Sequence, residues 1–325
     1  MTAVSTTRAA AENVPPPRGR RSTGLSRRPR RGKMVPYLLM SPAVLAIAAL
    51  IGFPAVLVLI TSFQKLDLGE LVTGRTVWVG FDNFKTVLSD PTFWADTVRT
   101  IVFTACCVAA TMALGLLIAL LLTKLGKGIR IFLQIALVLA WAMPILAATT
   151  VFQWMFDSHY GILNKTLMEL GFSGFKEHDW FASGASTLVI IGILIVWQAT
   201  PFVAFTVYAG LVSIPGEVYE ASALDGANAW QTFRSVSWPG IAPIVALTMF
   251  LQLLWDFKVF SQVWAIKQGG PNGGSTTLPV LQYLDGIANN HFGTAAAVSV
   301  LMIIIIVIIT VLYLRMLLRS QEVDL

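Results

Sequence analysis

One long apolar stretch in the second half of the chain carries an amide, an indole ring and a carboxylate on a common face. Gln252, Asp256 and Val259 are three or four residues apart, and Trp255 falls on the same side of a helix with that period. Aromatic rings stack on the apolar face of a pyranose, while amides and carboxylates bind its hydroxyls. Because a carboxylate in an apolar stretch is costly unless paired or hydrated, Asp256 indicates a functional site.

Two earlier apolar stretches offer groups of the same kinds. Trp141 comes just before Pro144 in one of them, and Gln198, Ala199 and Phe202 lie together in the next. Plain helix packing explains Phe202 and Trp255 as well as ring stacking does, so Gln252 and Asp256 carry most of the argument. The candidate residues of a solute pathway are Trp141, Gln198, Ala199, Phe202, Gln252, Trp255, Asp256 and Val259.

The sequence lacks the residue patterns of an enzyme. It contains no G-x-x-x-x-G-K-[ST] phosphate loop, and its three histidines are isolated from one another and from cysteine. The adjacent Cys106 and Cys107 indicate apolar packing, since neighbouring residues point to different faces of a helix. The sequence therefore predicts no catalytic residues, no metal site and no cofactor in this chain, and any energy for its function must come from a partner.

The elements that must position these groups are membrane helices. Apolar residues make up 56% of the 325 residues and charged residues 12%, with a mean hydropathy of +0.72, which is typical of a protein embedded in a bilayer. Six apolar stretches are about twenty residues or longer, enough to cross ~30 Å of hydrocarbon. The predicted fold is an all-α integral membrane protein with spans at 37–63, 101–123, 131–151, 187–211, 241–263 and 292–314.

Loop charges predict the orientation of the spans. Lys124, Lys127 and Arg130 follow the second span, and Arg315 and Arg319 follow the last, so these ends are expected in the cytoplasm together with both termini. The loops 64–100, 152–186 and 264–291 are then outside. Lys258 is expected to be the one basic residue within a span, with its side chain reaching the outer surface.

Three parts of the chain are distinguished by composition. Residues 1–35 are basic, rich in Pro and Ser and poor in large apolar side chains, which predicts a disordered cytoplasmic arm. A solvated tail that favours the anionic inner leaflet is preferred for this arm over nucleic-acid binding. The six-helix membrane body spans 36–320, and 321–325 form a short cytoplasmic tail.

A polar loop at 213–240 interrupts the apolar pattern on the cytoplasmic side. Helix formers at 217–223 follow Pro215-Gly216, with carboxylates early in the helix, and Gly226 permits a sharp turn. A second helical run at 229–236 is expected to end at Trp238-Pro239-Gly240. This arrangement predicts a compact projection that docks a soluble partner.

The residues of this loop resemble the EAA loop of binding-protein-dependent ABC importer permeases. Glu220-Ala221-Ser222 is followed at the family's spacing by Gly226 and by Val236-Ser237-Trp238-Pro239, with Ser222, Val236 and Trp238 departing from the usual residues. The resemblance implies a type I importer permease whose EAA helices are gripped by a dimer of ABC ATPases, which bind the ATP and Mg. It also implies coupling roles for Glu220, Ala221, Ser222, Asp225, Gly226 and Pro239.

Other segments resemble the maltose-type carbohydrate permeases, and specifically their F-type subunit. These segments are Gly80-Phe81-Asp82-Asn83-Phe84, Asp90-Pro91-Thr92-Phe93-Trp94, Gly269-Gly270-Pro271 and the run 292–297. The resemblance implies import of a neutral di- or oligosaccharide across a bacterial cytoplasmic membrane, with a second, G-type permease and an extracellular solute-binding protein as partners. A permease of the same superfamily for glycerol phosphate or another solute is the alternative, and a membrane enzyme or ion channel lacks any clustered catalytic or charged-ring residues.

Overall fold

The computed structural model describes residues 35–322, which fall into two units, 35–53 and 54–322. The expected arm (1–35) lies outside the described residues except for Val35. Of the expected tail (321–325), only Gln321 and Glu322 are described, as the end of a helix.

The described chain is almost entirely helical. In the first unit, α1 (Val35–Ile47) continues into a π-helical turn (Ala48–Gly52). Helix α2 (Phe53–Thr61) follows; its first residue is the last of the first unit, and the rest of it opens the second unit. Next comes a two-stranded hairpin made of β1 (Gln64–Lys65) and β2 (Val77–Trp78). Helix α3 (Leu68–Thr73) lies between these two strands in the sequence. The remaining helices are α4 (Asp82–Ser89), α5 (Pro91–Lys124), α6 (Lys127–Ala142), α7 (Ile145–Met155), α8 (Ile162–Glu169), α9 (Gly184–Ser213), α10 (Gly216–Leu224), α11 (Ala229–Thr232), α12 (Trp238–Phe257), α13 (Ser261–Lys267), α14 (Leu278–Tyr283) and α15 (Phe292–Glu322).

Membrane-spanning helices account for the predicted all-α fold. Within the described residues, five helices are long and apolar enough to cross a bilayer, and the pair α6 and α7 makes a sixth candidate although it is bent by 99°. The expected span at 131–151 falls on this bent pair, and the six expected crossings are matched when the pair is counted as one span. The expected spans at 101–123, 187–211 and 292–314 are shorter than the helices α5, α9 and α15 that contain them, because apolar length measures the hydrocarbon layer and helices continue beyond it. The expected span at 37–63 extends two residues past the end of α2 at Thr61.

The fifth expected span, 241–263, lies within a longer candidate span, Ala229–Lys267. Helix α12 begins at Trp238, before the expected start, and ends at Phe257. A short break at residues 258–260 then precedes α13, so Val259 lies in the break and Val263 lies on α13.

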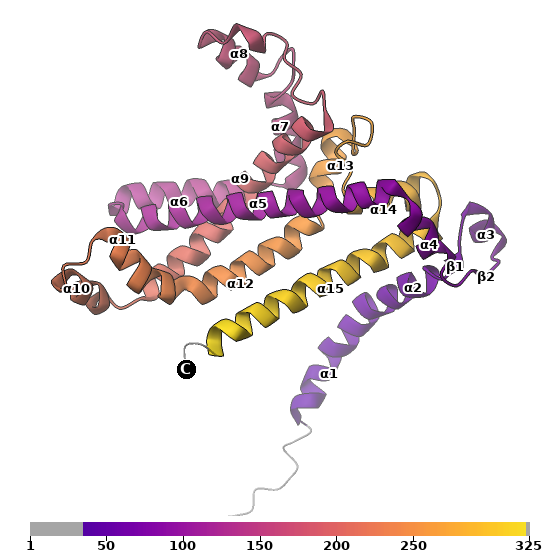
Figure 1. Ribbon diagram of the computed structural model, residues 1–325, viewed down its shortest axis with the longest axis horizontal. Coiled ribbons are helices and arrows are strands. Elements are labelled where there is room, and N and C mark those ends of the chain that lie inside the picture. The colour runs from indigo at the N-terminus through magenta and orange to yellow at the C-terminus, as the bar shows by residue number, and fades with distance from the viewer. Residues whose placement is uncertain (1–34, 323–325) are drawn as a thin grey trace, which may run out of the picture. The chain divides into compact units, whose positions relative to one another are not determined.

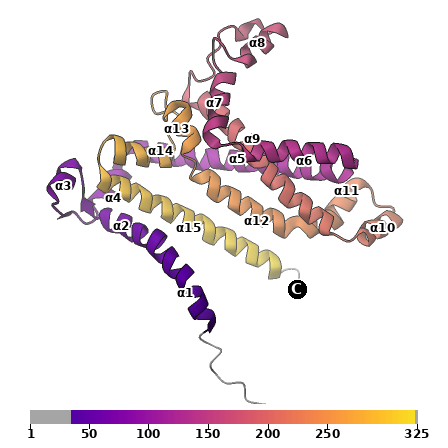
Figure 2. The ribbon, with the colours of Figure 1, turned by 180° about the vertical axis from the view of Figure 1, so that it is seen from behind.

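The second unit is built around contacts of α5 with α9 and of α12 with both, and α15 also contacts α12 (Figures 1 and 2). A buried apolar cluster of Ala119, Val203, Val207, Leu211 and Ile241 joins these three helices. Gly115 permits their close approach, because a Cβ there would lie 2.5 Å from Cγ1 of Val203.

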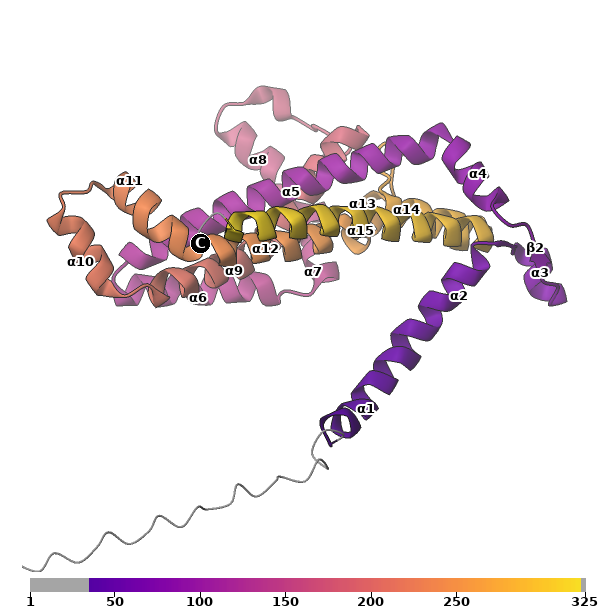
Figure 3. The same cartoon turned by 60° about the horizontal axis from the view of Figure 1, so that its bottom comes forward.

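The two ends of this helix bundle carry different structures. Figure 3 shows α10 and α11 at one end, and α3, α4 and β2 at the opposite end. Helix α8 belongs to a third projecting segment, which is organised around the buried side chain of Asn164. Its Nδ2 donates to the carbonyl of His178 (2.9 Å), and its Oδ1 accepts from Nε1 of Trp180 (2.7 Å).

Helix α5 begins ten residues before the expected span. The side chain of Asp90 accepts a hydrogen bond from the backbone N–H of Thr92 (2.8 Å), and Pro91 occupies the first helical position, where its missing N–H is harmless. Arg99 consequently lies on this helix, so the expectation that Lys258 is the one basic residue within a span is wrong. Arg99 pairs with the buried Asp96 and donates to the carbonyl of Thr276 (2.7 Å), which fixes the loop before α14.

Candidate functional site

All eight predicted pathway residues border a single cavity of about 570 Å³. The cavity lies where the break between α6 and α7 faces α9 and α12. Residues of the break and of the segment after α12 complete its wall, and the sequence patterns did not identify them: Met143, Pro144, Ile145, Ile195, Lys258, Phe260, Ser261 and Gln262.

The break at Met143-Pro144 opens the wall of this cavity. Pro144 disfavours helical geometry at the preceding residue, and Met143 is accordingly extended, with ψ near 129°. The carbonyl of Met143, freed from the helix, accepts a hydrogen bond from Nε2 of Gln198 (2.9 Å). A predicted pathway residue on α9 therefore also stabilises the irregular backbone, as breaks within membrane helices require.

Gln252 and Asp256 are buried in the wall of the cavity without their usual partners. Gln252 is fully buried and Asp256 is 4% exposed. Within the described residues, neither Nε2 nor Oε1 of Gln252 has a hydrogen-bond partner, and Oδ2 of Asp256 has none. Leaving a buried polar group unpaired costs about 1–3 kcal/mol. These two side chains thus provide a donor and acceptors that a polar solute in the cavity can satisfy.

The aromatic residues of the cavity pack partly on one another. The rings of Phe202 and Trp255 meet edge to face with centroids 5.1 Å apart, so the packing alternative explains a part of their placement. Trp141 and Trp255 each keep an exposed surface. Val259 borders the cavity although it lies beyond the end of α12. Lys258 is exposed at the border, and among the described residues that line the cavity it is the one basic side chain.

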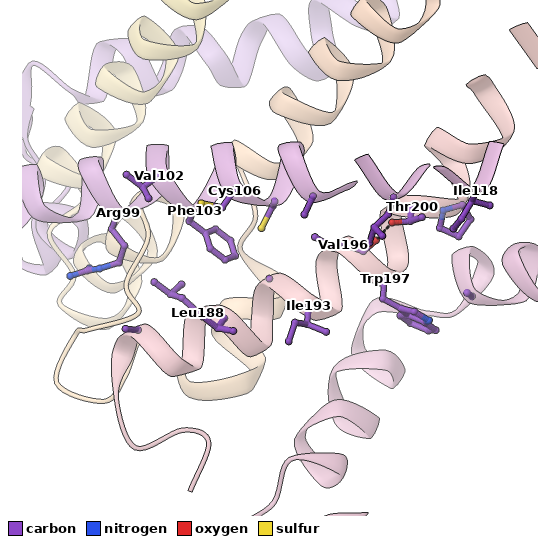
Figure 4. Close-up of a pocket in the computed structure, with 18 of the residues that line it drawn as sticks. Arg99, Val102, Phe103, Cys106, Ile118, Leu188, Ile193, Val196, Trp197 and Thr200 are labelled. Carbon is purple, nitrogen blue, oxygen red and sulfur yellow. Dashed lines mark hydrogen bonds between the residues drawn. The ribbon is translucent and has the colours of Figure 1, made fainter. Parts of the chain in front are cut away.

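A larger cavity, of about 810 Å³, lies between α5, α6 and α9 and contains none of the eight residues. Phe103 of α5 and Leu188 of α9 point toward one another across it (Figure 4). Its lining is almost wholly apolar, with Arg99 and Thr200 as the main polar contributors. This composition suits an apolar chain better than a sugar, whose hydroxyls would lose their hydrogen bonds there.

The second predicted site, the loop between α9 and α12, is folded by two complementary helix caps. Helix α10 ends in a Schellman motif, in which Gly226 N–H donates to the carbonyl of Ala223 (3.1 Å) and Ala227 N–H donates to that of Ser222 (3.1 Å). Gly226 has φ +76°, the left-handed conformation that glycine tolerates best. Asn228 then caps α11, since its Oδ1 accepts from the backbone N–H of Gln231 (3.0 Å).

Two side-chain contacts hold α10 against the following helix. The buried Ser222 hydroxyl lies 3.1 Å from that of Thr232, and the Tyr219 hydroxyl lies 3.2 Å from that of Ser237. The other predicted coupling residues, Glu220, Ala221, Asp225, Gly226 and Pro239, are exposed. Exposed apolar side chains lie beside them, with Leu224 at 90% and Trp230 at 67%. The loop thus presents a mixed acidic and apolar surface.

The expected end of the second loop helix at Trp238-Pro239-Gly240 is wrong. Helix α11 passes through a π-helical turn (Phe233–Ser237) directly into α12. In this turn the N–H of Trp238 donates to the carbonyl of Phe233, one residue further back than in an α-helix. Pro239 follows the π turn after Trp238 and, lacking an N–H, donates no backbone hydrogen bond to that turn. The loop and the wall of the cavity are therefore parts of one continuous helix.

Comparison with known proteins agrees with these features. The family described as binding-protein-dependent transport system inner membrane component matches residues 111–321. The diacetylchitobiose uptake system permease protein DasB of Streptomyces coelicolor is 45% identical over 296 residues, which cover 91% of this chain and 90% of that protein. The trehalose/maltose transport system permease protein MalF of Thermococcus litoralis is 29% identical, over 86% of this chain and 92% of that protein.

A solved structure shares the fold. A chain of a bacterial ABC transporter involved in the import of the acidic polysaccharide alginate superposes with a TM-score of 0.77 at 18% identity, over 87% of this chain and 94% of that chain. The fold is thus that of a type I ABC importer permease, and the relatives named above are permease subunits rather than enzymes. Together with the family match and the relative at 45% identity, this makes the chain a member of the binding-protein-dependent transport system inner membrane component family.

Proposed function

We propose that this chain is a permease subunit of an ATP-driven importer for a neutral di- or oligosaccharide, and that the 570 Å³ cavity is part of the sugar pathway. The observation that carries the proposal is the pair of unpartnered buried side chains, Gln252 and Asp256, in a cavity that also exposes indole rings. A sugar offers hydroxyls to the first two and an apolar ring face to the indoles. The expected pathway residues on α6, α9 and α12 line the same space.

The substrate class that fits this cavity best is an N-acetylated disaccharide. The relative at 45% identity is named for diacetylchitobiose uptake. The amide of Gln252 has both its donor and its acceptor unpaired, and an acetamido group offers one acceptor and one donor in return. Asp256 is then available to accept from a ring hydroxyl. An anionic solute such as glycerol phosphate is less favoured, because Lys258 is the one basic described residue at the cavity and it lies exposed at the border.

Energy for transport is proposed to reach the cavity through the loop at 213–240. Exposed Leu224 and Trp230 supply apolar area for a groove on an ABC ATPase dimer, and exposed Glu220 and Asp225 supply charge for specificity. ATP and Mg are proposed to be bound by that partner rather than by this chain. Glu220, Ala221, Ser222, Asp225, Gly226 and Pro239 are the proposed transmission residues.

The proposed orientation follows from the two ends of the bundle. The end with α10 and α11 faces the ATPase in the bacterial cytoplasm, as do both termini, and the end with α3 and α4 faces outward. A solute-binding protein delivers sugar at the outer end. In this proposal a G-type second permease completes the pathway.

The test is transport by the complete complex in proteoliposomes. The chain is purified with its co-purifying ATPase and second permease, and ATP-dependent uptake of diacetylchitobiose, cellobiose and glycerol phosphate is measured in the presence of the binding protein. Gln252→Ala removes one side of the amide pair, so uptake of diacetylchitobiose should fall by about 5- to 100-fold, as a loss of ~1–3 kcal/mol implies. Gln282→Ala, at a different cavity, is the matched control and should change little.

The possible results of this experiment test the substrate assignment and the importer function separately. Uptake of cellobiose in preference to diacetylchitobiose would reject the acetamido assignment and retain the sugar importer. Preferential uptake of glycerol phosphate would reject the sugar. A chain that isolates without any ATPase, even after crosslinking, would reject the importer.

A further inference from the structure

The hairpin that follows the first span has an unusual distribution of side chains. Its helix α3 turns Leu68, Leu71 and Val72 outward, and the neighbouring strand exposes Trp78. Leu68, Leu71 and Val72 occupy positions i, i+3 and i+4, so they form one continuous apolar stripe. Val72 is 78% exposed. A six-residue helix surrounded by water would be expected to show the opposite arrangement.

The charged residues of the same hairpin are used internally. The carboxylate of Glu70 accepts from the backbone N–H of Asp67 (3.3 Å) and pairs with Lys65 (3.5 Å), and it is only 18% exposed. Among the described carboxylates, none pairs with the exposed Arg75. The outer surface of the hairpin therefore combines apolar side chains with one free cation.

Hydrogen bonds fix this hairpin at a membrane boundary. Its base begins three residues after the end of α2, and Nδ2 of Asn83 donates to the carbonyls of Ser62 (2.9 Å) and Gln64 (2.8 Å). The carbonyl of Leu66 accepts from the backbone N–H of Phe292 (2.9 Å), the first residue of α15. Two spanning helices thus end and begin at the base of the hairpin, which places its apolar stripe at the level where hydrocarbon gives way to headgroups.

We propose that the surface formed by Leu68, Leu71, Val72, Trp78 and Arg75 is a membrane-interface anchor that inserts into the leaflet at this end of the bundle. Such anchors combine a Trp at the membrane–water interface, aliphatic side chains that enter the hydrocarbon, and a cation that contacts the lipid phosphates. A protein partner fits less well, since stable protein interfaces use about 20–30 residues a side and this surface offers five.

A physical role follows from the hydrogen bonds at the base. Because the same hairpin is bonded to α4 and to the start of α15, an anchor here holds the ends of α2 and α15 at a constant depth while the bundle changes conformation. This inference requires only that the chain spans a membrane, and it stands whether or not the solute is a sugar.

The experiment measures lipid contact at two adjacent residues of the complete complex. Cys106 and Cys107, the two cysteines of the sequence, are replaced by alanine, and single cysteines are introduced by Val72→Cys or Thr73→Cys and labelled with an environment-sensitive fluorophore. Both positions are exposed, but Thr73 lies on the opposite side of α3 from the stripe, so it is the matched control. ATPase activity checks that each labelled complex is intact.

In proteoliposomes, phospholipids with a nitroxide near the top of the acyl chain should quench the Val72 probe about twofold or more beyond the Thr73 probe, as a probe in the interface requires. Aqueous iodide should show the reverse order. Equal quenching at the two positions by each agent would overturn the anchor. A Val72 probe shielded from iodide but not quenched by lipid would show that a protein covers the surface, and would overturn it also.

Discussion

The turn at Gly226 allows the coupling role of the loop to be tested by backbone geometry alone. Gly226 has φ +76°, and a Cβ built there has no neighbour within 4 Å. A substitution therefore meets no steric clash with other residues and changes only the cost of the left-handed conformation. Asn adopts this conformation comparatively easily, whereas a β-branched residue does so rarely.

The expected magnitude follows from that cost. Holding an L-residue in the left-handed region costs about 1–2 kcal/mol, which lowers the equilibrium population of the intact turn by a factor of about 5–30. Gly226→Val should therefore reduce ATP-driven uptake severalfold while the protein still reaches the membrane. Gly226→Asn should retain most of the activity, and Gly226→Ala should fall between them.

The assay is uptake and solute-stimulated ATP hydrolysis in proteoliposomes, with the amount of each variant in the membrane measured in parallel. Gly216→Val is the matched control, because Gly216 lies in the same loop and its Cβ would also meet nothing within 4 Å, but it has no positive φ. Equal activity of the Val and Asn variants at 226 would refute the reasoning. So would an equal loss at 216, because the effect would then not depend on the left-handed turn.

Three further predictions concern Arg99, Asn164 and Asp157. Arg99→Ala leaves Asp96 buried without its partner, so thermal unfolding in detergent should show that the free energy of unfolding falls by roughly 3–5 kcal/mol. Adding Asp96→Asn should recover part of this stability, and no recovery would contradict the pairing. Asn164→Ala removes the hydrogen bonds to His178 and Trp180, so protease should cleave the segment around α8 faster than α9, at an expected cost of ~1–3 kcal/mol, and unchanged cleavage would be the contrary result. The backbone N–H groups of Tyr160 and His159 donate to the carboxylate of Asp157 and lower its pKa. The ionised carboxylate therefore stabilises this turn fully at pH values above its ordinary pKa of about 3.9. This stabilisation is lost as the pH falls through the lowered pKa. Amide exchange at Tyr160, corrected for intrinsic rates, should therefore accelerate at acidic pH, and Asp157→Asn should remove the pH dependence.

The sequence was sufficient for those features that depend on local chemistry. Apolar length identified the crossings, and glycine identified the left-handed turn at Gly226, since few other residues tolerate it. The four-residue spacing of Gln252 and Asp256 put them on one face of α12, and both border the cavity. The sites themselves stay predictions, because the geometry brings the residues together without a solute or an ATPase.

Other features depend on contacts between distant residues and could not be predicted from local patterns. Pro144 indicated that a helix break was tolerable, but the 99° bend also depends on Gln198, which satisfies the freed carbonyl of Met143 from another helix. The contact of Arg99 with the carbonyl of Thr276 spans 177 residues of sequence. The start of α5 at Pro91, in contrast, could have been predicted from local sequence. Asp90-Pro91 is a recognisable helix start, but a prediction based on hydropathy alone does not use it.

The π-helical turn between α11 and α12 sets the rotational phase of the cavity wall relative to the loop. An α-helix advances by about 100° per residue, and a π turn absorbs one additional residue without passing that rotation on. If the turn at Phe233–Ser237 tightened into regular α-helix while α10 stayed docked, Gln252 and Asp256 would swing around the axis of α12 and leave the cavity. The single additional residue in this turn therefore determines which side chains of α12 face the cavity.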